Sequence, residues 1–371
     1  MGIRCNVLIF IRLFCLYFAL SDAAHAMRAY SEPVLSGNSA VILMYHHVST
    51  ESHPDTSVSP DVFKQHMQFI EDNEYIVWPL IKILMYLSTG KRIPPKTVVL
   101  TFDDAYSSVY SEAFPILKDR GWPFTVFVTT NYIGEGYRNF MSWQQLREIQ
   151  RYGGDVGNHS LSHTHFVRQT STENEIQWRQ RIINEIHQAQ LTLQQHVKNP
   201  VRVVAYPYGE YSNKVKNILR EMNYFGLGQQ SGAVSYSTDF QAIPRFSIAT
   251  GFDSIEDFEI KISSLRLPVT VLSPLDGLVS KDEAIPVMRI KLSPGNYKKE
   301  ALACYASGQG RIQVDWIDHR KLIVDVKANK TIKAGRTKYN CTAPSKTEAG
   351  VFYWFSFLWM KLQDDGEWYR E

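Results

Sequence analysis

The chain has 371 residues, of which 44% are apolar and 21% charged, enough to bury one large core or a large and a small one. Its formal net charge is only +3 and its basic residues are scattered, which excludes the concentrated basic surface of a nucleic-acid-binding protein. The composition therefore favours a globular protein whose partner is neutral or a small molecule.

The N-terminus has the features of a secretion signal. Arg4 gives a positive start, residues 7–20 are mostly apolar, and Ala24-His25-Ala26 has the small-x-small pattern of a cleavage site. We predict a signal peptide over residues 1–26, a linker over 27–37, and export to the periplasm or surface of a bacterium. An uncleaved membrane anchor is the alternative, since Arg12 interrupts the apolar run.

Export changes how the cysteines are interpreted. Cys5 and Cys15 fall within the signal, so the mature chain keeps Cys304 and Cys341. Two cysteines in an oxidising compartment predict one disulfide, and two free buried thiols are the alternative.

Residues 38–264 alternate between β-like runs and amphipathic helical stretches. The predicted strands are AVILMYH, TVVLTF, FTVFVT, GGDVGNH, VRVVAYP, YFGLGQ and AIPRFSI. The predicted helices are PDVFKQHMQFIEDN, AYSSVYSEAFPILKDRG, SWQQLREIQRYG, residues 173–196 and SNKVKNILREMN. This alternation predicts a parallel sheet, open or closed into a barrel, with its chemistry at the carboxyl ends of the strands.

Residues 265–371 show β-type runs and no good helix, which predicts a small all-β sandwich. The runs are IPVMRIKLS, ALACYAS, GRIQVDWID, KLIVDVK and VFYWFSFLWMKL. The aromatic residues 352–359 could form a sugar platform, but both alternating faces are apolar, which suits a central strand better. This domain could dock an envelope partner, present substrate or simply stabilise the fold.

Asp103 and Asp104 close one strand, in the sequence LTFDDAY. Two adjacent carboxylates are costly to hold together unless a cation or a proton separates their charges. Neighbours on an extended chain point in opposite directions, so the two aspartates can serve different purposes. The simpler alternative is a helix N-cap with a spare neighbour.

His159 and His163 close another strand, in GGDVGNHSLSH. A spacing of four puts both imidazoles on one side of a helical turn, close enough to bind one metal ion. His165 is a further candidate ligand, and a solvated histidine-rich loop is the alternative. Two histidines and one aspartate at strand ends form a set of three ligands with open positions, as in hydrolytic metal sites. The remaining aspartate is then available as a base.

These motifs resemble those of the NodB-homology polysaccharide deacetylases, carbohydrate esterase family 4. TFDDA is followed about 55 residues later by HSLSH, and AYPYGEY at residues 205–211 is similar to the family's third motif. LMYHHV, which precedes the double aspartate, resembles the permuted branch that deacetylates poly-β-1,6-N-acetylglucosamine. The resemblance covers residues 38–262 and implies a distorted (β/α) barrel.

The resemblance also implies roles for individual residues. Asp103 would be the general base, His46 the general acid, and Tyr208 the donor to the oxyanion through its backbone N–H. Asp104, His159 and His163 would hold a divalent metal, with zinc favoured and cobalt or nickel possible. His47 competes with His46, but neighbours on a strand face opposite ways.

Two positions depart from the family pattern. Many members carry an arginine two residues before the proline of the third motif, where this chain has Ala205. We expect Arg245, in AIPRFSI, to pair with Asp103 instead; the alternative is a surface arginine. Ala105 replaces a glycine after the aspartates, a small change at an expected helix start.

Two aromatic residues are candidates for stacking on a sugar, Trp143 and Tyr206, with ordinary packing as the alternative for each. The resulting prediction is a metal-dependent polysaccharide N-deacetylase that acts on an N-acetylated glycan. A peptidoglycan or chitin-oligomer deacetylase, an O-acetyl esterase, and a carbohydrate-binding protein on a decayed barrel are the alternatives.

Overall fold

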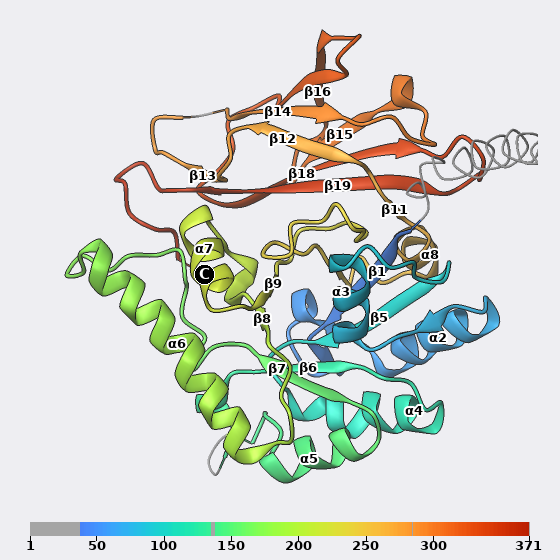
Figure 1. Cartoon of the computed structure of the whole chain (residues 1–371), viewed down its shortest axis with the longest axis vertical. Coiled ribbons are helices and arrows are strands. Elements are labelled where there is room, and N and C mark those ends of the chain that lie inside the picture. The colour runs from blue at the N-terminus through green and yellow to red at the C-terminus, as the bar shows by residue number, and fades with distance from the viewer. Residues whose placement is uncertain (1–37, 135–137, 284, 371) are drawn as a thin grey trace, which may run out of the picture. The chain divides into compact units, whose positions relative to one another are not determined.

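The computed structural model describes residues 38–134, 138–283 and 285–370, so the predicted signal peptide and linker lie outside the described residues. An eight-stranded sheet runs in the order β10-β1-β5-β6-β7-β8-β9, with β4 also pairing with β5, and all its pairs are parallel. A bridge joins Leu227 of the edge strand β9 to Ile243, which lies just before the other edge strand, β10, so the sheet curls toward closure. The predicted distorted (β/α) barrel is confirmed (Figure 1). The strands are β1 (Ala40–Tyr45), β4 (Ile76–Val77), β5 (Thr97–Phe102), β6 (Thr125–Val128), β7 (Asp155–Asn158), β8 (Val203–Ala205), β9 (Phe225–Leu227) and β10 (Phe246–Ser247).

Both faces of this sheet are buried, as expected where helices cover parallel strands. Along β1, Val41, Leu43 and Tyr45 face the largest core, to which α2, α4, α5 and α8 contribute. Ala40 and Ile42 face a second core, which α3 fills. The helices are α2 (Pro60–Asp72), α3 (Leu80–Ser88), α4 (Phe114–Asp119), α5 (Trp143–Arg151), α6 (Glu175–His196), α7 (Asn213–Glu221) and α8 (Ile255–Ile262).

Side-chain caps explain why most helices begin where the sequence predicts. Ser59, Ser142 and Ser212 each accept a hydrogen bond from a backbone N–H in the first turn of α2, α5 and α7. Helix α3 was not predicted, because it follows Pro79 without a side-chain cap and its sequence is mostly apolar. Helix α8 was also missed, since eight residues show little periodicity. None of the described helices combines the length and apolar character needed to cross a membrane.

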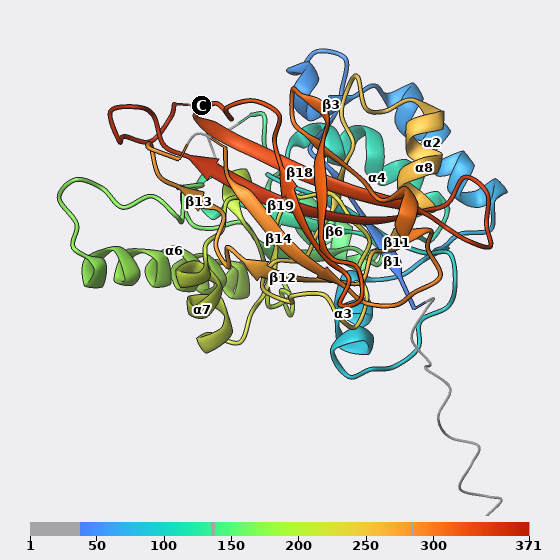
Figure 2. The same ribbon diagram turned by 90° about the horizontal axis from the view of Figure 1, so that it is seen from above.

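The C-terminal residues form a nine-stranded sheet in the order β11-β19-β18-β15-β16-β17-β14-β12, with β13 also pairing with β19. The buried faces of its two ends share one core, so this sheet folds back on itself and the predicted all-β domain is confirmed. It lies on one side of the α/β domain (Figures 1 and 2), where Trp354 packs edge-on against Phe246 of β10. The strands are β11 (Leu265–Arg266), β12 (Val269–Ser273), β13 (Leu278–Val279), β14 (Val287–Leu292), β15 (Ala303–Ala306), β16 (Gly310–Asp318), β17 (Ile323–Lys327), β18 (Gly335–Pro344) and β19 (Phe352–Lys361).

The aromatic strand β19 lies inside this sheet, between β18 and the short strands β11 and β13, as the sequence favoured. Its neighbour β18 was not predicted. The buried positions of β18 are Thr337, Tyr339, Cys341 and Ala343, which alternate with polar residues but are only weakly apolar.

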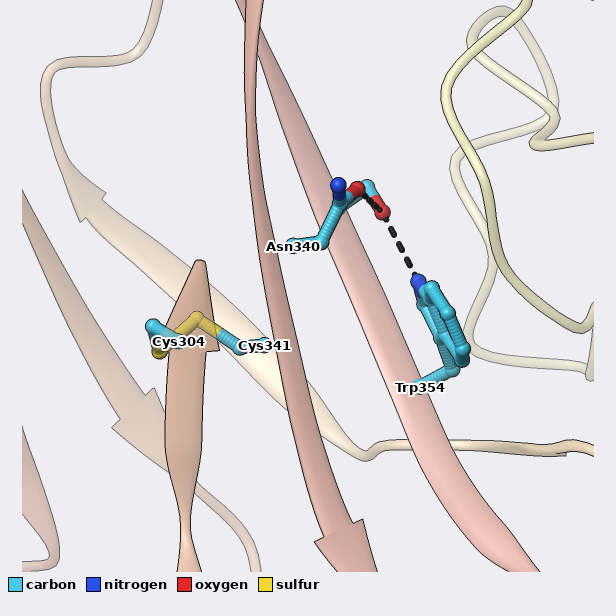
Figure 3. The surroundings of a disulfide bond; sticks show 5 residues. Cys304, Asn340, Cys341 and Trp354 are labelled. Atoms are coloured by element: carbon cyan, nitrogen blue, oxygen red, sulfur yellow. Dashed lines mark hydrogen bonds between the residues drawn. A yellow bond between two sulfur atoms is a disulfide. The ribbon is translucent and has the colours of Figure 1, made fainter. Parts of the chain in front are cut away.

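Cys304 of β15 and Cys341 of β18 lie opposite each other in the ladder and form the predicted disulfide (Figure 3). Both are fully buried in the C-terminal core. On the neighbouring strand, Trp354 Nε1 donates to Ser356 Oγ, which donates to Asn340 Oδ1, at 3.1 and 2.6 Å. The disulfide thus links β15 and β18, which are separated along the chain by β16 and β17.

Replacing both cysteines by alanine is expected to lower the free energy of unfolding by about 4 kcal/mol, because the bond closes a loop with a sequence separation of 37 residues. Urea unfolding of the oxidised protein and of the double variant measures the difference. The reduced wild type serves as the control and should resemble the variant. A change below about 1 kcal/mol would contradict this contribution.

Candidate active site

The two aspartates follow β5 directly and face different partners. Asp103 is fully buried, and Asp104 is 9% exposed. Asp104 and Ala105 adopt the left-handed conformation, with φ of 69° and 60°. The chain therefore makes a sharp turn here, and the helix begins at Ser107 rather than at Ala105 as predicted. This turn directs neighbouring carboxylates to opposite sides.

Asp103 forms a bidentate ion pair with Arg245, as the sequence led us to expect. Nη1 and Nη2 of Arg245 each lie 2.7 Å from a carboxylate oxygen, and both side chains are fully buried. Arg245 also donates to the Thr101 hydroxyl and to the Gly228 carbonyl. Burial raises the pKa of Asp103, but the charge and hydrogen bonds of Arg245, together with His159 and His46, lower the pKa overall. The carboxylate is therefore held ionised and in a fixed orientation.

Asp104 faces the two histidines of the HSLSH motif. Asp104 Oδ1 lies 3.2 Å from His159 Nε2 and 3.3 Å from His163 Nε2. One ligand atom from each of the three residues lies within 4.8 Å of the others. These residues come from the ends of β5 and β7, which parallel pairing brings to the same edge of the sheet.

The geometry of this trio fits a small divalent ion. Ligand atoms about 2.1 Å from a tetrahedral zinc ion lie about 3.4 Å apart, close to the distances found here. His159 Nδ1 lies 2.8 Å from the Ala205 carbonyl, which can only accept a hydrogen bond. Nδ1 therefore carries the proton and Nε2 presents its lone pair to the site, the arrangement typical of a metal-ligating histidine.

The two histidines converge through an irregular loop, and the prediction of a helical turn was wrong. Residues 159–165 contain no helix, and Ser160 and His163 have positive φ of 71° and 59°. The backbone N–H of His163 donates to Ser160 Oγ at 2.8 Å, which closes the loop locally. His165 turns away from the trio and pairs through Nδ1 with Glu210 at 2.9 Å.

His46 and His47 occupy different surroundings. Burial lowers the pKa of His46, although Asp103 and Asp104 raise it, so the field of both carboxylates acts on this imidazole. His47 stacks on Tyr106, with ring centroids 3.5 Å apart, and its Nδ1 lies 3.1 Å from the Ser52 hydroxyl. The charges of both aspartates thus act on His46, whereas of the two only that of Asp104 acts on His47.

Tyr208 lies in the short helical segment η4 (Pro207–Gly209) after β8, with a left-handed φ of 59°. Its ring stacks on His165 at 3.8 Å and meets His163 edge-on at 4.6 Å. Tyr208 therefore lies beside the metal-ligand candidates. A non-glycine residue in this conformation costs about 1–2 kcal/mol, which the surrounding contacts must offset.

Left-handed residues gather at this site. Among the described residues, ten other than glycine have positive φ. Five of the ten lie in these loops: Asp104, Ala105, Ser160, His163 and Tyr208. Backbone strain of this kind is concentrated at functional sites, where it fixes side chains in orientations that a relaxed chain would not hold.

The structure does not bring the two candidate sugar-stacking residues to the site. Tyr206 is wholly buried and donates its hydroxyl to the Gln241 carbonyl, so this prediction was wrong. Trp143 is half-buried at the start of α5, packs against the main core and stacks on His196 at 4.3 Å. Both side chains therefore pack against neighbouring residues of the α/β domain.

Three features of the site were not singled out from the sequence. Tyr106, directly after the aspartates and Ala105, is sandwiched between His47 and Phe140. Glu210, in the third motif, is fully buried. A cavity of about 550 Å³ adjoins His47, and its lining includes Ser107, Ser108, Asn139, Glu51 and Glu112. Tyr106 and Glu210 could have been singled out from the sequence, since they lie within the motifs LTFDDAY and AYPYGEY.

Comparison with known proteins agrees with this geometry. Residues 90–226 match the family model for polysaccharide deacetylase. The poly-β-1,6-N-acetyl-D-glucosamine N-deacetylase of Staphylococcus aureus is 26% identical over 234 residues, which cover 57% of this chain and 79% of that enzyme.

Two solved structures are similar in fold. The Streptococcus pyogenes deacetylase PplD, in complex with acetate, superposes with a TM-score of 0.54 and 25% identity over 60% of this chain and 98% of its own. IcaB from Ammonifex degensii gives a TM-score of 0.50 and 25% identity over 58% of this chain and 94% of its own. The chain therefore contains a polysaccharide deacetylase domain of the NodB-homology type.

Proposed function

We propose that the chain is a metal-dependent hydrolase that removes N-acetyl groups from an N-acetylglucosamine-containing polysaccharide at the cell envelope. The observation that carries this proposal is the convergence of Asp104, His159 and His163 beside the buried Asp103–Arg245 pair. The name of the Staphylococcus aureus relative supports a poly-β-1,6-linked substrate. The hydroxyl- and carboxylate-lined cavity next to His47 suits a saccharide, whose hydroxyls need such partners.

The trio would hold the cation through one carboxylate oxygen and two imidazole nitrogens, a donor set that zinc, cobalt and nickel accept. A divalent cation bound there supplies a Lewis acid that polarises a carbonyl and makes nearby water more acidic. The protein's own contribution is to fix those three ligands and to place acid, base and hydrogen-bond donors around the acetyl group.

Asp103 acts as the general base in this mechanism. Its carboxylate, kept ionised by Arg245, accepts a proton from water as the water oxygen bonds to the acetyl carbon. The backbone N–H of Tyr208 donates to the oxyanion that develops, and one such donor is typically worth about 3 kcal/mol. His46 donates a proton to the amide nitrogen as the C–N bond breaks, because the unprotonated amine is a poor leaving group. The products are acetate and a free amino sugar.

An envelope location is supported by two features of the chain. The N-terminal 26 residues have the pattern of a secretion signal, and Cys304 and Cys341 form a disulfide, a bond that persists in oxidising compartments. The C-terminal domain is a candidate docking surface for an envelope-associated partner.

Acetate release from defined oligomers tests the proposal. We expect release from β-1,6-linked N-acetylglucosamine oligomers to exceed release from β-1,4-linked ones, and a chelator to abolish it. Preference for β-1,4-linked oligomers would indicate a chitin or peptidoglycan deacetylase, and release from O-acetylated glycans alone would indicate an esterase. Binding without any acetate release would contradict the proposed reaction and favour a carbohydrate-binding protein.

A further inference from the structure

The C-terminal β domain reaches the loop that carries Tyr208. Nη1 of Arg336, on strand β18, donates to the Tyr208 carbonyl oxygen at 3.0 Å. The Arg336 guanidinium also lies 5.7 Å from the centre of the Tyr208 ring and 3.9 Å from the Glu210 carboxylate. One residue of the β domain thus contacts three parts of the loop.

The C-terminal tail makes a second connection, through the buried Glu210 carboxylate. Glu210 accepts hydrogen bonds from His165 at 2.9 Å, from Arg168 at 3.1 Å and from the Tyr369 hydroxyl. Arg168 donates in turn to the Tyr369 carbonyl at 2.8 Å. Burial raises the pKa of Glu210, but these donors outweigh it and lower the pKa overall, so the carboxylate is the charged centre of the network.

Both sets of contacts act on the same short segment. Tyr208 is left-handed, and its ring stacks on His165, which Glu210 holds by a hydrogen bond. Arg336 holds the carbonyl of the same residue. Holding the ring and the carbonyl of Tyr208 restricts its ψ, and the Gly209 N–H, which donates to the Tyr206 carbonyl at 2.8 Å, closes the turn around its φ of 59°. Together these contacts fix the direction of the Tyr208 N–H. A strained residue keeps its conformation only when its neighbours determine it in this way.

We propose that the C-terminal β domain is a structural part of the active site, in which Arg336 and Tyr369 are positioning residues that hold the Tyr208 loop in its catalytic geometry. This inference rests on the proposed function, in which the Tyr208 N–H donates to the oxyanion. The domain then does more than stabilise the fold, because the loop lacks its full set of contacts without β18 and the tail.

Two substitutions in the full-length protein test this proposal. Tyr369→Phe removes only the hydroxyl that donates a hydrogen bond to Glu210. Arg336→Gln removes the positive charge and shortens the side chain that donates to the Tyr208 carbonyl. Each is expected to lower kcat for acetate release about tenfold while KM and metal content stay unchanged, since a donor to the oxyanion acts in the transition state. Arg336→Lys, which can still donate to the carbonyl, should recover part of the loss.

Matched controls come from the same domain. Arg289→Gln removes an arginine that pairs with Asp325, and Tyr305→Phe removes an exposed hydroxyl on β15; neither residue contacts the loop. Both controls should keep the wild-type kcat. An equal loss in the controls, or wild-type kcat in Tyr369→Phe and Arg336→Gln, would overturn the proposal and leave the proposed function standing.

A second measurement is independent of catalysis. Amide hydrogen exchange over residues 206–211 should rise in Tyr369→Phe and Arg336→Gln and stay at the wild-type level in both controls. Unchanged exchange in the two test variants would overturn the proposal even if kcat fell. A wild-type protein that released no acetate from any glycan would contradict the proposed function, while this exchange measurement would still decide whether the β domain holds the loop.

Discussion

Asp103→Asn is expected to lower kcat for acetate release by about three orders of magnitude while the protein still binds one metal ion per chain. Asparagine has nearly the same shape and can still accept a hydrogen bond from Arg245, but it cannot take a proton from water. The metal-ligand candidates Asp104, His159 and His163 are unchanged. The substitution should therefore remove proton transfer and leave metal binding intact. Acetate release and metal analysis on the same preparation provide both values.

Stability has to be measured alongside, because Asp103 and Arg245 are both fully buried. Breaking a buried ion pair costs about 3–5 kcal/mol, so the assay is run well below the melting temperature of the variant. Asp239→Asn is the matched control, since Asp239 pairs with Lys216 away from the site. Near-normal turnover in a folded, metal-loaded Asp103→Asn protein would show that Asp103 is not the base.

His159→Ala is expected to abolish both metal binding and acetate release. Its Nε2 is one of the three candidate ligand atoms, and its Nδ1 is fixed by the Ala205 carbonyl, so we expect that the remaining pair cannot recreate the site. We expect metal affinity to fall by more than about 100-fold, because loss of even an outer partner of a ligand costs 10–100-fold. Calorimetric titration with zinc measures the affinity directly.

Two further variants complete this test. His163→Ala should give the same result with less effect on folding, since His163 is only partly buried whereas His159 is 1% exposed. His187→Ala, an exposed histidine on α6, should retain wild-type metal binding and activity. Metal binding that survives in both His159→Ala and His163→Ala would mean that the ion binds elsewhere.

Much of the site could be predicted because parallel sheets impose a simple rule. Strands β5 and β7 end at the same edge, so residues placed directly after them meet there whatever the loops do. This is why Asp104 and His159 could be brought together from sequence alone. The pairing of Asp103 with Arg245, 142 residues away, was expected from the family resemblance, because Ala205 stands where many members carry an arginine and Arg245 lies at a predicted strand.

Local conformation was harder to predict. The spacing of His159 and His163 suggested a helical turn, but left-handed residues at Ser160 and His163 produce the convergence instead. Such conformations are rare outside glycine and leave no periodic signal. Tyr206 shows the same limit, since a residue beside the third motif turns its ring into the core rather than toward a ligand.

The contacts between the β domain and the Tyr208 loop could not be predicted from the sequence. Arg336 lies 128 residues from Tyr208, and Tyr369 lies 159 residues from Glu210. Neither residue falls in a motif, and β18 is too weakly apolar to be recognised as a strand. Packing between the domains creates these contacts, so only the three-dimensional arrangement reveals them.

Zinc titration of the metal-free protein tests the central claim most directly. With an N-acetylglucosamine oligomer as substrate, acetate release should rise from background and reach its maximum at one equivalent of zinc per chain, and Asp104→Ala should stay at background throughout. Full activity of the metal-free wild type, or zinc-dependent activity that survives in Asp104→Ala, would contradict the account.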